Sequence, residues 1–338
     1  MSITAKQLAT LLNLSPAAVS MALNNKPGVS TLTRHKVIET AKKYEYDFSR
    51  IEENHHSNSV YGTIQFIIYK KSGAIITDTP FFSQLSEGIS DACKSEHYNL
   101  NINYMCDHDD ITNMLNKYNN YNCSGIILLA TEMSQSDFKP FLSSNIPIVV
   151  LDCYYDNLDC NFIMINNHKG AFQATNYLIR QCKSQPGYLH SSYSIANFEE
   201  RANGFFHAIR SNGMSTSRCM IHPLTPSIEG AYADMCALLK NNETIASCYF
   251  ADNDLIACGA MKAFKEYGYK IPQDISIIGF DNLPICNYSD PMLTTLKVSV
   301  NNMGQTAILR LVHIINCKVF DFFKIELAPE LIVRNSVI

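Results

Sequence analysis

The chain has 338 residues, of which 46% are hydrophobic and 17% are charged, so it has the length for two or three compact units and the apolar side chains to fill their cores. No apolar run reaches membrane-spanning length, and the first residues lack the organisation of a signal peptide, so we expect a cytoplasmic protein with no membrane partner. Residues 1–50 hold seven Lys/Arg against three acids, a net charge of +4 within a chain whose total is −4. A basic head on an acidic body favours a DNA-binding protein.

The twelve cysteines are spread singly along the chain. They form no C-x-x-C pair, and no Cys/His spacing matches a zinc module. In a reducing compartment we expect small apolar core residues, with disulfides or a bound metal as the alternative. Neither a metal nor a cofactor is expected.

Three short helices are predicted in the first fifty residues. Thr4 and Gln7 have the spacing of a capping box ahead of the first helix. Ser15 is the expected N-cap of the second helix, with Pro16 at its first position, and Ser30 begins the third. The link between the first two helices is short enough only for a sharp corner, which is typical of a helix-turn-helix. We expect one small core, formed by Leu8, Leu11, Val19, Leu23, Val37 and Ile38.

The second helix has small residues near its N-terminus, so it can enter a major groove without steric obstruction. Its N-terminal N–H groups and the neighbouring hydroxyls suit contact with phosphate. The alternative is a three-helix bundle that binds protein.

Residues 3–46 resemble the head of the lactose-repressor/galactose-repressor family. The resemblance is carried by Leu14-Ser15-Pro16-Ala17-Ala18-Val19-Ser20-Met21, by Leu23-Asn24 and by Gly28-Val29-Ser30. By position it implies that Pro16, Ala17 and Met21 read bases, although the family usually has an arginine where Met21 stands. Methionine cannot bind guanine in a bidentate manner, so thymine methyls or DNA shape gain importance. The expected DNA-contacting residues are Thr4, Ser15, Pro16, Ala17, Ala18, Ser20, Met21, Asn24, Ser30 and His55.

Residues 48–60 are the expected linker between a head at 1–47 and a body at 61–338. In the family this segment forms a hinge helix whose leucine enters the minor groove. Here Phe48 stands at the family's proline and His55 at its leucine, while Glu52 and Glu53 would lie close to phosphates. We expect weaker intercalation and less DNA kinking than is usual for the family. His55 is either a pH-sensitive DNA contact or a solvated linker residue.

From residue 61 onward, apolar strands alternate with amphipathic helices, which predicts an α/β body with parallel sheets. The predicted strands are Ile64–Ile68, Ser124–Leu129, Ile146–Asp152, Ser247–Ala251 and Ile275–Phe280, and a helix is predicted from Phe82 to Ser95. Open α/β sheets bind ligands beyond the carboxyl ends of their strands, so the polar residues that follow these strands are candidates: Asp152, Asp252-Asn253-Asp254 and Asp281-Asn282. No nucleophile-elbow, P-loop, zinc-protease or dinucleotide motif is present, which argues against the common enzyme classes.

The family resemblance continues to the C-terminus. It is carried, in order, by Pro80-Phe81-Phe82, Asn166-Asn167, Gly170-Ala171, Arg201 with Gly204-Phe205, Asn253-Asp254, Gly279-Phe280-Asp281-Asn282, Pro291–Thr295, Met303-Gly304 and Pro329–Arg334. It implies a two-lobed body like the sugar-binding proteins of the periplasm, in which the chain crosses between lobes near residues 161, 290 and 322. The expected lobes are about 61–161 with 291–322, and about 162–290 with 323–338.

The resemblance also implies an effector site between the lobes. Phe81 and Phe82 would present an aromatic face, Arg201 a fork for hydroxyls or a carboxylate, and Asn253 an amide. Asp281 would accept from ligand hydroxyl or amine groups, with Asp152 as a neighbour. Taken singly, each residue has a structural alternative: the two phenylalanines in the core, Arg201 in an ion pair, and Asp281-Asn282 in a turn.

The expected function is that of a homodimeric transcriptional regulator that binds a pseudo-palindromic DNA operator and responds to a small polar effector, a saccharide or a derivative. One alternative is a sugar-binding sensor whose head is degenerate or repurposed. The other is an enzyme that uses the two-lobed body for chemistry.

Overall fold

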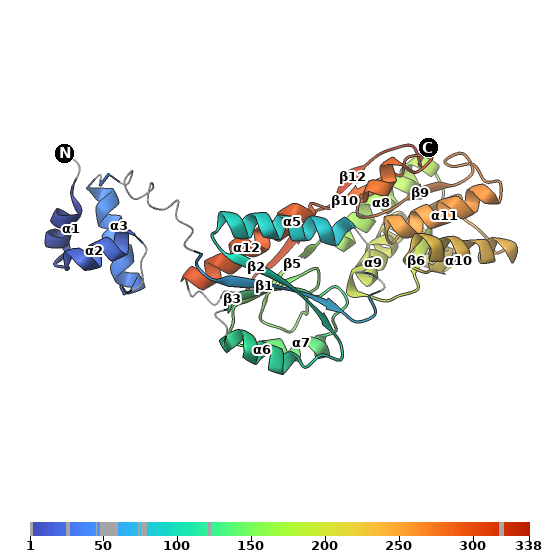
Figure 1. Ribbon diagram of the computed structural model, residues 1–338. Helices are drawn as coiled ribbons and strands as arrows, with labels where there is room; N and C mark the ends of the chain where they lie inside the picture. Colours follow the sequence, from blue (N-terminus) through green and yellow to red (C-terminus); the bar gives the residue numbers. More distant parts are fainter. Residues whose placement is uncertain are drawn as a thin grey trace. The chain divides into compact units, whose positions relative to one another are not determined.

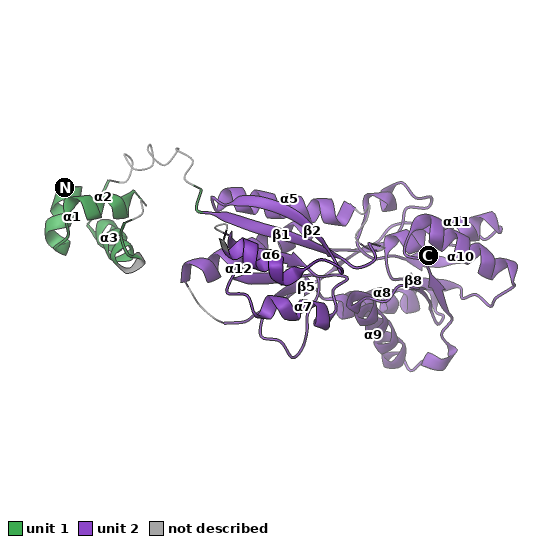
Figure 2. Ribbon diagram, turned by 60° about the horizontal axis from the view of Figure 1, so that its bottom comes forward, with its two compact units in different colours: residues 1–61 green, residues 62–338 purple. Residues whose placement is uncertain are grey.

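A computed structural model of the chain describes residues 3–24, 28–44, 46–47, 60–73, 75, 80–120, 123–317 and 321–338. The chain forms two compact units, residues 1–61 and residues 62–338 (Figure 2). Among the described residues, no helix is long and apolar enough to cross a lipid bilayer. All twelve cysteines are free thiols, and Cys93, Cys153, Cys248 and Cys286 are buried.

The first unit contains the three predicted helices with the predicted N-caps. The helices are α1 (Ala5–Leu12), α2 (Pro16–Leu23) and α3 (Thr31–Lys43). The Thr4 hydroxyl accepts from the backbone of Gln7, whose side chain bonds back to the Thr4 N–H, so the capping box is confirmed. The Ser15 hydroxyl accepts from the backbone N–H of Ala18 at 3.1 Å, and Ser30 caps α3 in the same way.

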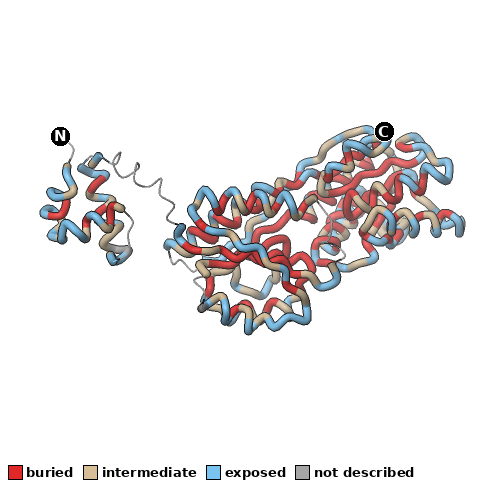
Figure 3. Tube along the Cα trace, in the orientation of Figure 1, coloured by how far each residue is buried: buried red, intermediate tan, exposed pale blue. Residues whose placement is uncertain are grey.

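The core of this unit corrects two predictions. The buried residues are Leu8, Ala9, Val19, Ala22, Leu23, Val37 and Ala41 (Figure 3). Leu11 was expected among them but is 52% exposed. Leu12, one position further along α1, packs against the core instead. Helical spacing from Leu8 reaches both Leu11 and Leu12, so periodicity alone does not decide between them. Ile38 was also expected in this core, but it is half-buried and outside it, because Val37 and Ala41 are the core-facing residues of α3.

A six-stranded parallel sheet forms the first lobe of the body. Its strand order is β11-β5-β4-β3-β1-β2. Its strands are β1 (Thr63–Lys70), β2 (Asn99–Cys106), β3 (Cys123–Leu129), β4 (Ile148–Leu151), β5 (Asn161–Ile165) and β11 (Lys324–Leu327).

Helices cover both faces of this sheet (Figure 1). Side chains alternate along β1: Ile64, Phe66 and Ile68 join the core beneath α5 and α12, while Ile67 and Tyr69 join the core beneath α6 and α7. This burial on both faces explains why the strand is nearly continuously apolar. The helices are α5 (Pro80–Ser95), α6 (Ile111–Asn120), α7 (Gln135–Leu142) and α12 (Val300–Cys317).

The second lobe contains a four-stranded parallel sheet in the order β7-β6-β8-β9. Helices α8 and α9 pack on one of its faces, and α10 and α11 on the other. The elements are β6 (Gly187–Ser191), β7 (Ile221–Leu224), β8 (Cys248–Ala251), β9 (Ser276–Ile278), α8 (Asn167–Cys182), α9 (Ala196–Ser211), α10 (Ile228–Lys240) and α11 (Asp254–Glu266), with short 3₁₀ turns at Thr216–Arg218 and Pro284–Asn287.

The lobe crossings differ from the expected positions. β5 and β11 were assigned to the second lobe by crossings near 161 and 322, but both strands belong to the first sheet, so those crossings follow residues 165 and 327. The remaining crossing passes through the region expected near 290, where β10 (Thr295–Lys297) pairs antiparallel with β12 (Glu330–Ile332). The sequence of a strand does not indicate which of two sheets the strand joins. The predicted lobe crossings therefore differ from the observed ones.

The contact between α8 and α9 depends on the absence of a side chain at Gly204. A Cβ at this position would lie 2.2 Å from the backbone oxygen of His168 and 3.0 Å from the Cβ of Ala171. Because two backbones must separate to admit a methyl group, we expect Gly204→Ala to lower the free energy of unfolding by about 1–3 kcal/mol. Urea denaturation measures this, with Ser211→Ala at the exposed end of α9 as the control. Equal stability of the two variants would contradict the close approach of α8 and α9 at Gly204.

Candidate functional site

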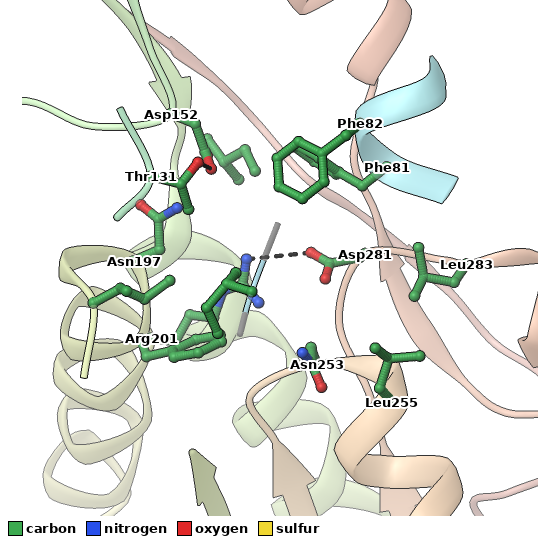
Figure 4. A pocket seen from close by; sticks show the side chains of 14 residues that line it. Phe81, Phe82, Thr131, Asp152, Asn197, Arg201, Asn253, Leu255, Asp281 and Leu283 are labelled. Atoms are coloured by element: carbon green, nitrogen blue, oxygen red, sulfur yellow. Dashed lines mark hydrogen bonds and ion pairs between the residues drawn. The ribbon is translucent and has the colours of Figure 1, made fainter. Parts of the chain in front are cut away.

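A cavity of about 470 Å³, including the part open to solvent, lies between the two lobes (Figure 4). All six residues expected at an effector site line it: Phe81, Phe82, Asp152, Arg201, Asn253 and Asp281. Phe81 and Phe82 come from the first lobe, whereas Arg201 and Asn253 come from the second. A ligand in this cavity therefore contacts both lobes.

The topology explains why polar side chains gather here. Asp152 directly follows β4, and Asn253 and Asp281 follow β8 and β9 within three residues. Parallel strands end at a common edge, where a two-lobed α/β protein leaves its cleft. The backbone N–H of Ile256 donates to the Asn253 side-chain oxygen at 2.9 Å, so this residue caps α11 and has its NH₂ group left for a ligand.

The two aspartates of the cavity occupy unusual backbone conformations. Asp152 has φ +60° and Asp281 has φ +102°. Non-glycine residues rarely adopt positive φ, and such strain persists where the surrounding structure imposes it, often at ligand sites. Asp281-Asn282 does not form the turn that was its structural alternative: Asp281 pairs with Lys297 in an isolated β-bridge, and its carboxylate lies at the cavity wall.

Arg201 is 3% exposed and its guanidinium is extensively bonded to protein. Its Nε donates to Asn167 Oδ1 at 2.8 Å, one Nη donates to the backbone oxygen of Asp252, and the other lies 3.2 Å from Asp281 Oδ1. The guanidinium also stacks on Phe280 at 3.7 Å from the ring centroid. Arg201 therefore fixes the position of the Asp281 carboxylate. Its guanidinium was expected from the sequence to bind the ligand directly.

Asp152 is 3% exposed, and its Oδ2 accepts a hydrogen bond of 2.7 Å from Thr131. Burial raises the pKa of its carboxyl group to about 6, against the lowering effects of Thr131 and Arg201. Thr131 follows β3 and was missed in the sequence, although the same reasoning about strand ends finds it. Asn197, in the first turn of α9, was also missed, because nothing in the sequence marks a polar residue on a helix as facing the cleft.

Asp252 and Asp254 were candidates from their place after β8, but neither lines the cavity. Both are fully buried. Asp252 accepts from the Tyr188 hydroxyl and from the backbone of Ser191, and Asp254 accepts from the backbone of Leu283 at 2.7 Å. They stabilise the loops that present Asn253 and Asp281.

Glu132 anchors the loop that contributes Ile75 to the cavity. Its carboxylate accepts from the backbone N–H groups of Lys71, Ser72, Gly73 and Ile75 at 2.8–3.0 Å. Burial alone would raise the pKa of this carboxyl group, but the four donors hold it below its usual value.

We expect Glu132→Gln to lower the free energy of unfolding by about 1–2 kcal/mol, because an amide offers one acceptor in place of two charged ones. Ligand affinity should fall as well, since Ile75 lines the cavity. Chemical denaturation and calorimetry measure the two effects, and Glu87→Gln, on the exposed side of α5, is the control. If Glu132→Gln left both the free energy of unfolding and the ligand affinity unchanged, the four hydrogen bonds of Glu132 would contribute to neither.

The residues expected to contact DNA form an accessible surface on the head. The nine that the structure describes are exposed or half-buried, and none belongs to the core. Three of them, Thr4, Ser15 and Ser30, are the N-caps of the helices. Pro16 and Ala17 are exposed in the first turn of α2, and Met21 is half-buried one turn later. His55 and linker residues 48–59 lie outside the described residues.

Together these features define a periplasmic-binding-protein-like body that carries a helix-turn-helix head. Residues 177–337 match the periplasmic binding protein-like domain. The chain is 27% identical to the HTH-type transcriptional repressor PurR of Pasteurella multocida, over 99% of this chain and 98% of that protein. It is also 27% identical to the NTD biosynthesis operon regulator NtdR of Bacillus subtilis, over 98% and 99%.

Two solved structures share the fold over the whole chain. A transcriptional regulator CelR–cellobiose complex superposes with a TM-score of 0.71 at 20% identity, and a lac repressor dimer bound to operator and the anti-inducer ONPF with 0.69 at 19%, each covering 99% of both chains. In its head, its two-lobed body and its full-length likeness to these proteins, the chain resembles transcriptional regulators of the LacI/GalR family.

Proposed function

We propose that the protein is a homodimeric repressor that binds a pseudo-palindromic operator in the cytoplasm and responds to a small polar effector, a saccharide or a derivative. The observation that carries this proposal is the cavity whose lining residues come from both lobes. A ligand that binds the closed arrangement more tightly shifts the population toward it, which is how a remote cleft controls a DNA-binding head.

The head supports the DNA-binding part of the proposal. The exposed first turn of α2 carries only small side chains, which leaves the helix N-terminus open to a major groove. Contacts from a single head are few, so a two-fold dimer that engages two half-sites supplies the affinity. The names of the relatives support repression, and the cellobiose and operator complexes of the solved structures support saccharide and operator as partners.

In the proposed site, Phe81 and Phe82 pack against the apolar face of a ring, their own rings 5.1 Å apart in an edge-to-face pair. Asn253 offers its NH₂ group, and Asp281 and Asp152 accept from the ligand. Arg201 acts chiefly by positioning Asp281, since each of its three nitrogens already donates one hydrogen bond to a protein oxygen.

The test is selection from a pool of random duplexes by the full chain, followed by gel shifts of the selected duplex with and without members of a metabolite panel. We expect an enriched palindrome and at least one compound that changes operator affinity. Ligand binding without any enriched palindrome would favour the alternative, a sugar-binding sensor with a repurposed head. Turnover of a bound compound would favour an enzyme.

Asp281→Ala should remove the effector response. The change deletes a ligand acceptor and leaves the Nη2 group of Arg201, whose side chain is 4% exposed, without its carboxylate. Operator affinity of this variant should no longer change with the compound that regulates the unmodified chain. The control is Asp290→Ala, an aspartate whose side chain is 91% exposed and pairs with Lys265. A full response by Asp281→Ala would remove Asp281 from the site.

A further inference from the structure

One buried acceptor in the cleft has no hydrogen-bond partner among the residues that the structure describes. The Oδ1 atom of Asp152 is inaccessible to solvent. The side-chain amide of Asn197 lies close enough to lower the pKa of the carboxyl group, but no donor in the described part of the chain reaches Oδ1 with hydrogen-bond geometry. The other oxygen, Oδ2, is held by Thr131. Leaving such an atom without a donor is unfavourable, so a group outside the protein, such as a water or a ligand, is expected to complete the bond.

Figure 4 shows that the Asp152 side chain faces the cavity from the first lobe, across from Arg201 and Asp281. Because Asp152 lines the cavity wall, a ligand in the cavity is the group placed to donate to it. The unsatisfied acceptor therefore belongs to the ligand site, and its chemistry restricts what the ligand carries.

The charges that line the cavity do not balance. Of the lining residues in the described chain, only Asp152, Arg201 and Asp281 carry charged side chains, which gives a net charge of −1 when all three are ionised. Arg201 is paired with Asp281 and bonded to two further protein oxygens. Asp152 is therefore the carboxylate of the cavity without an ion pair of its own, and its burial raises the pKa of the carboxyl group to about 6 although the charge of Arg201 acts to lower it.

Three kinds of ligand group can be compared at this position. An anionic group would repel two carboxylates. A neutral hydroxyl donates the missing hydrogen bond but leaves the buried charge uncompensated. A protonated amine donates the hydrogen bond and also neutralises the charge, which makes the bond charge-assisted.

The rest of the lining indicates the frame that bears this amine. The side chains of Ile75, Phe81, Phe82, Ile165, Ile195, Phe198, Leu255 and Leu283 are apolar, so they suit the C–H faces of a saturated ring. Asn253 and Asp281 remain for hydroxyl groups of the same ring. A long aliphatic amine would leave these two polar groups unused.

We propose that the effector is an amino sugar or amino cyclitol whose protonated amine binds Asp152, and that Asp152 thereby selects against neutral sugars. This inference rests on the proposed effector role of the cleft and names the class of its ligand. It assigns specificity to a residue that sequence reasoning treated only as a neighbour of the site.

The test compares matched ligands on the full chain by calorimetry and thermal shift at neutral pH. The pairs are glucosamine with glucose, galactosamine with galactose and mannosamine with mannose, with the N-acetylated forms as neutral derivatives of similar shape. Cyclohexylamine and cyclohexanol at millimolar concentration add a pair that does not depend on sugar stereochemistry. We expect at least one amine to bind more tightly than its neutral counterparts by a factor on the order of 10 to 100.

Asp152→Asn should abolish this preference while leaving the protein folded, because it removes a buried charge that has no counter-ion of its own. A melting curve checks the fold. Asp156→Asn, an exposed aspartate in the same loop, is the matched control and should keep the preference.

The outcomes separate the two proposals. If neutral sugars bind as tightly as the amines, the assignment of an amine is overturned, but the proposal that the cleft binds an effector is not. No preference for an amine in any pair, cyclohexylamine included, also overturns it. An amine preference that survives Asp152→Asn overturns the role of Asp152. Failure of the proposed function shows separately, as an operator affinity that no bound ligand changes.

Discussion

Ala17→Asp should abolish operator binding while the head remains folded. Ala17 is exposed in the first turn of α2, behind the N-cap Ser15 and the N1 residue Pro16. A carboxylate in the first turn of a helix interacts favourably with the helix dipole, so folding should not suffer. The same carboxylate would face DNA phosphates and base-edge acceptors, and affinity should fall by a factor on the order of 100 or more.

Fluorescence anisotropy with the selected duplex measures the affinity, and a thermal melt measures the stability of the chain. Thr10→Asp is the control, since it adds the same charge at an exposed position on α1. It should weaken binding only slightly, through the change in net charge. Equal losses in the two variants would mean that α2 has no special relation to the DNA. Undiminished binding by Ala17→Asp would exclude α2 as the reading helix.

Each strand that the sequence predicts carries a continuous apolar run, although β5, which carries one from Phe162 to Ile165, was not predicted. β1, β3, β4, β8 and β9 were all located within a few residues of their observed bounds. β2 was not predicted, because as an edge strand it is mostly exposed and its sequence, Asn99–Cys106, is largely polar. Edge strands lack the burial on both faces that makes central parallel strands recognisable.

The cavity was predictable where topology determines it. Asp152, Asn253 and Asp281 follow predicted strands, and the rule that ligands bind beyond strand ends identifies them. That rule does not separate lining residues from their buried neighbours: Asp252 and Asp254 satisfy it equally and face inward. Nor does it show that Arg201 is bonded to protein, since that depends on Asn167 and Asp281, 34 and 80 residues away in the chain.

Buried carboxylates also determine how stability depends on pH. Asp254 is fully buried, and burial, with the nearby Asp281 charge, raises the pKa of its carboxyl group from 3.8 to about 7. The folded state therefore binds a proton near neutral pH that the unfolded state does not. Stability contributed in this way increases as pH falls from about 8 to 5 and is lost as pH rises through the folded pKa. Asp152, with a pKa of about 6, acts in the same direction.

Other groups in this window act in both directions. The hydrogen bond to Asp252 raises the pKa of His190, so its contribution also decreases as pH rises, whereas burial lowers the pKa of His222 and has the opposite effect. Glu132 and Asp137 have lowered pKa values, so their contributions are lost only at more acidic pH. The Asp254 contribution is therefore isolated by comparing the unmodified chain with Asp254→Asn.

The asparagine at position 254 can keep both local contacts. Its amide oxygen can accept from the backbone of Leu283, and its amide nitrogen can donate to the hydroxyl of Thr295, which lies 2.5 Å from the present carboxylate. We expect the unmodified chain to gain about 2 kcal/mol relative to Asp254→Asn between pH 8 and pH 5, as urea denaturation would measure it. Asp159→Asn, at an exposed position, should follow the unmodified chain at every pH. Parallel pH profiles for the unmodified chain and Asp254→Asn would show that the buried carboxyl group does not titrate in this range. If the unmodified chain instead lost stability relative to Asp254→Asn toward pH 5, the pKa of the Asp254 carboxyl group would be lowered. A positive charge near Asp254 would then be required.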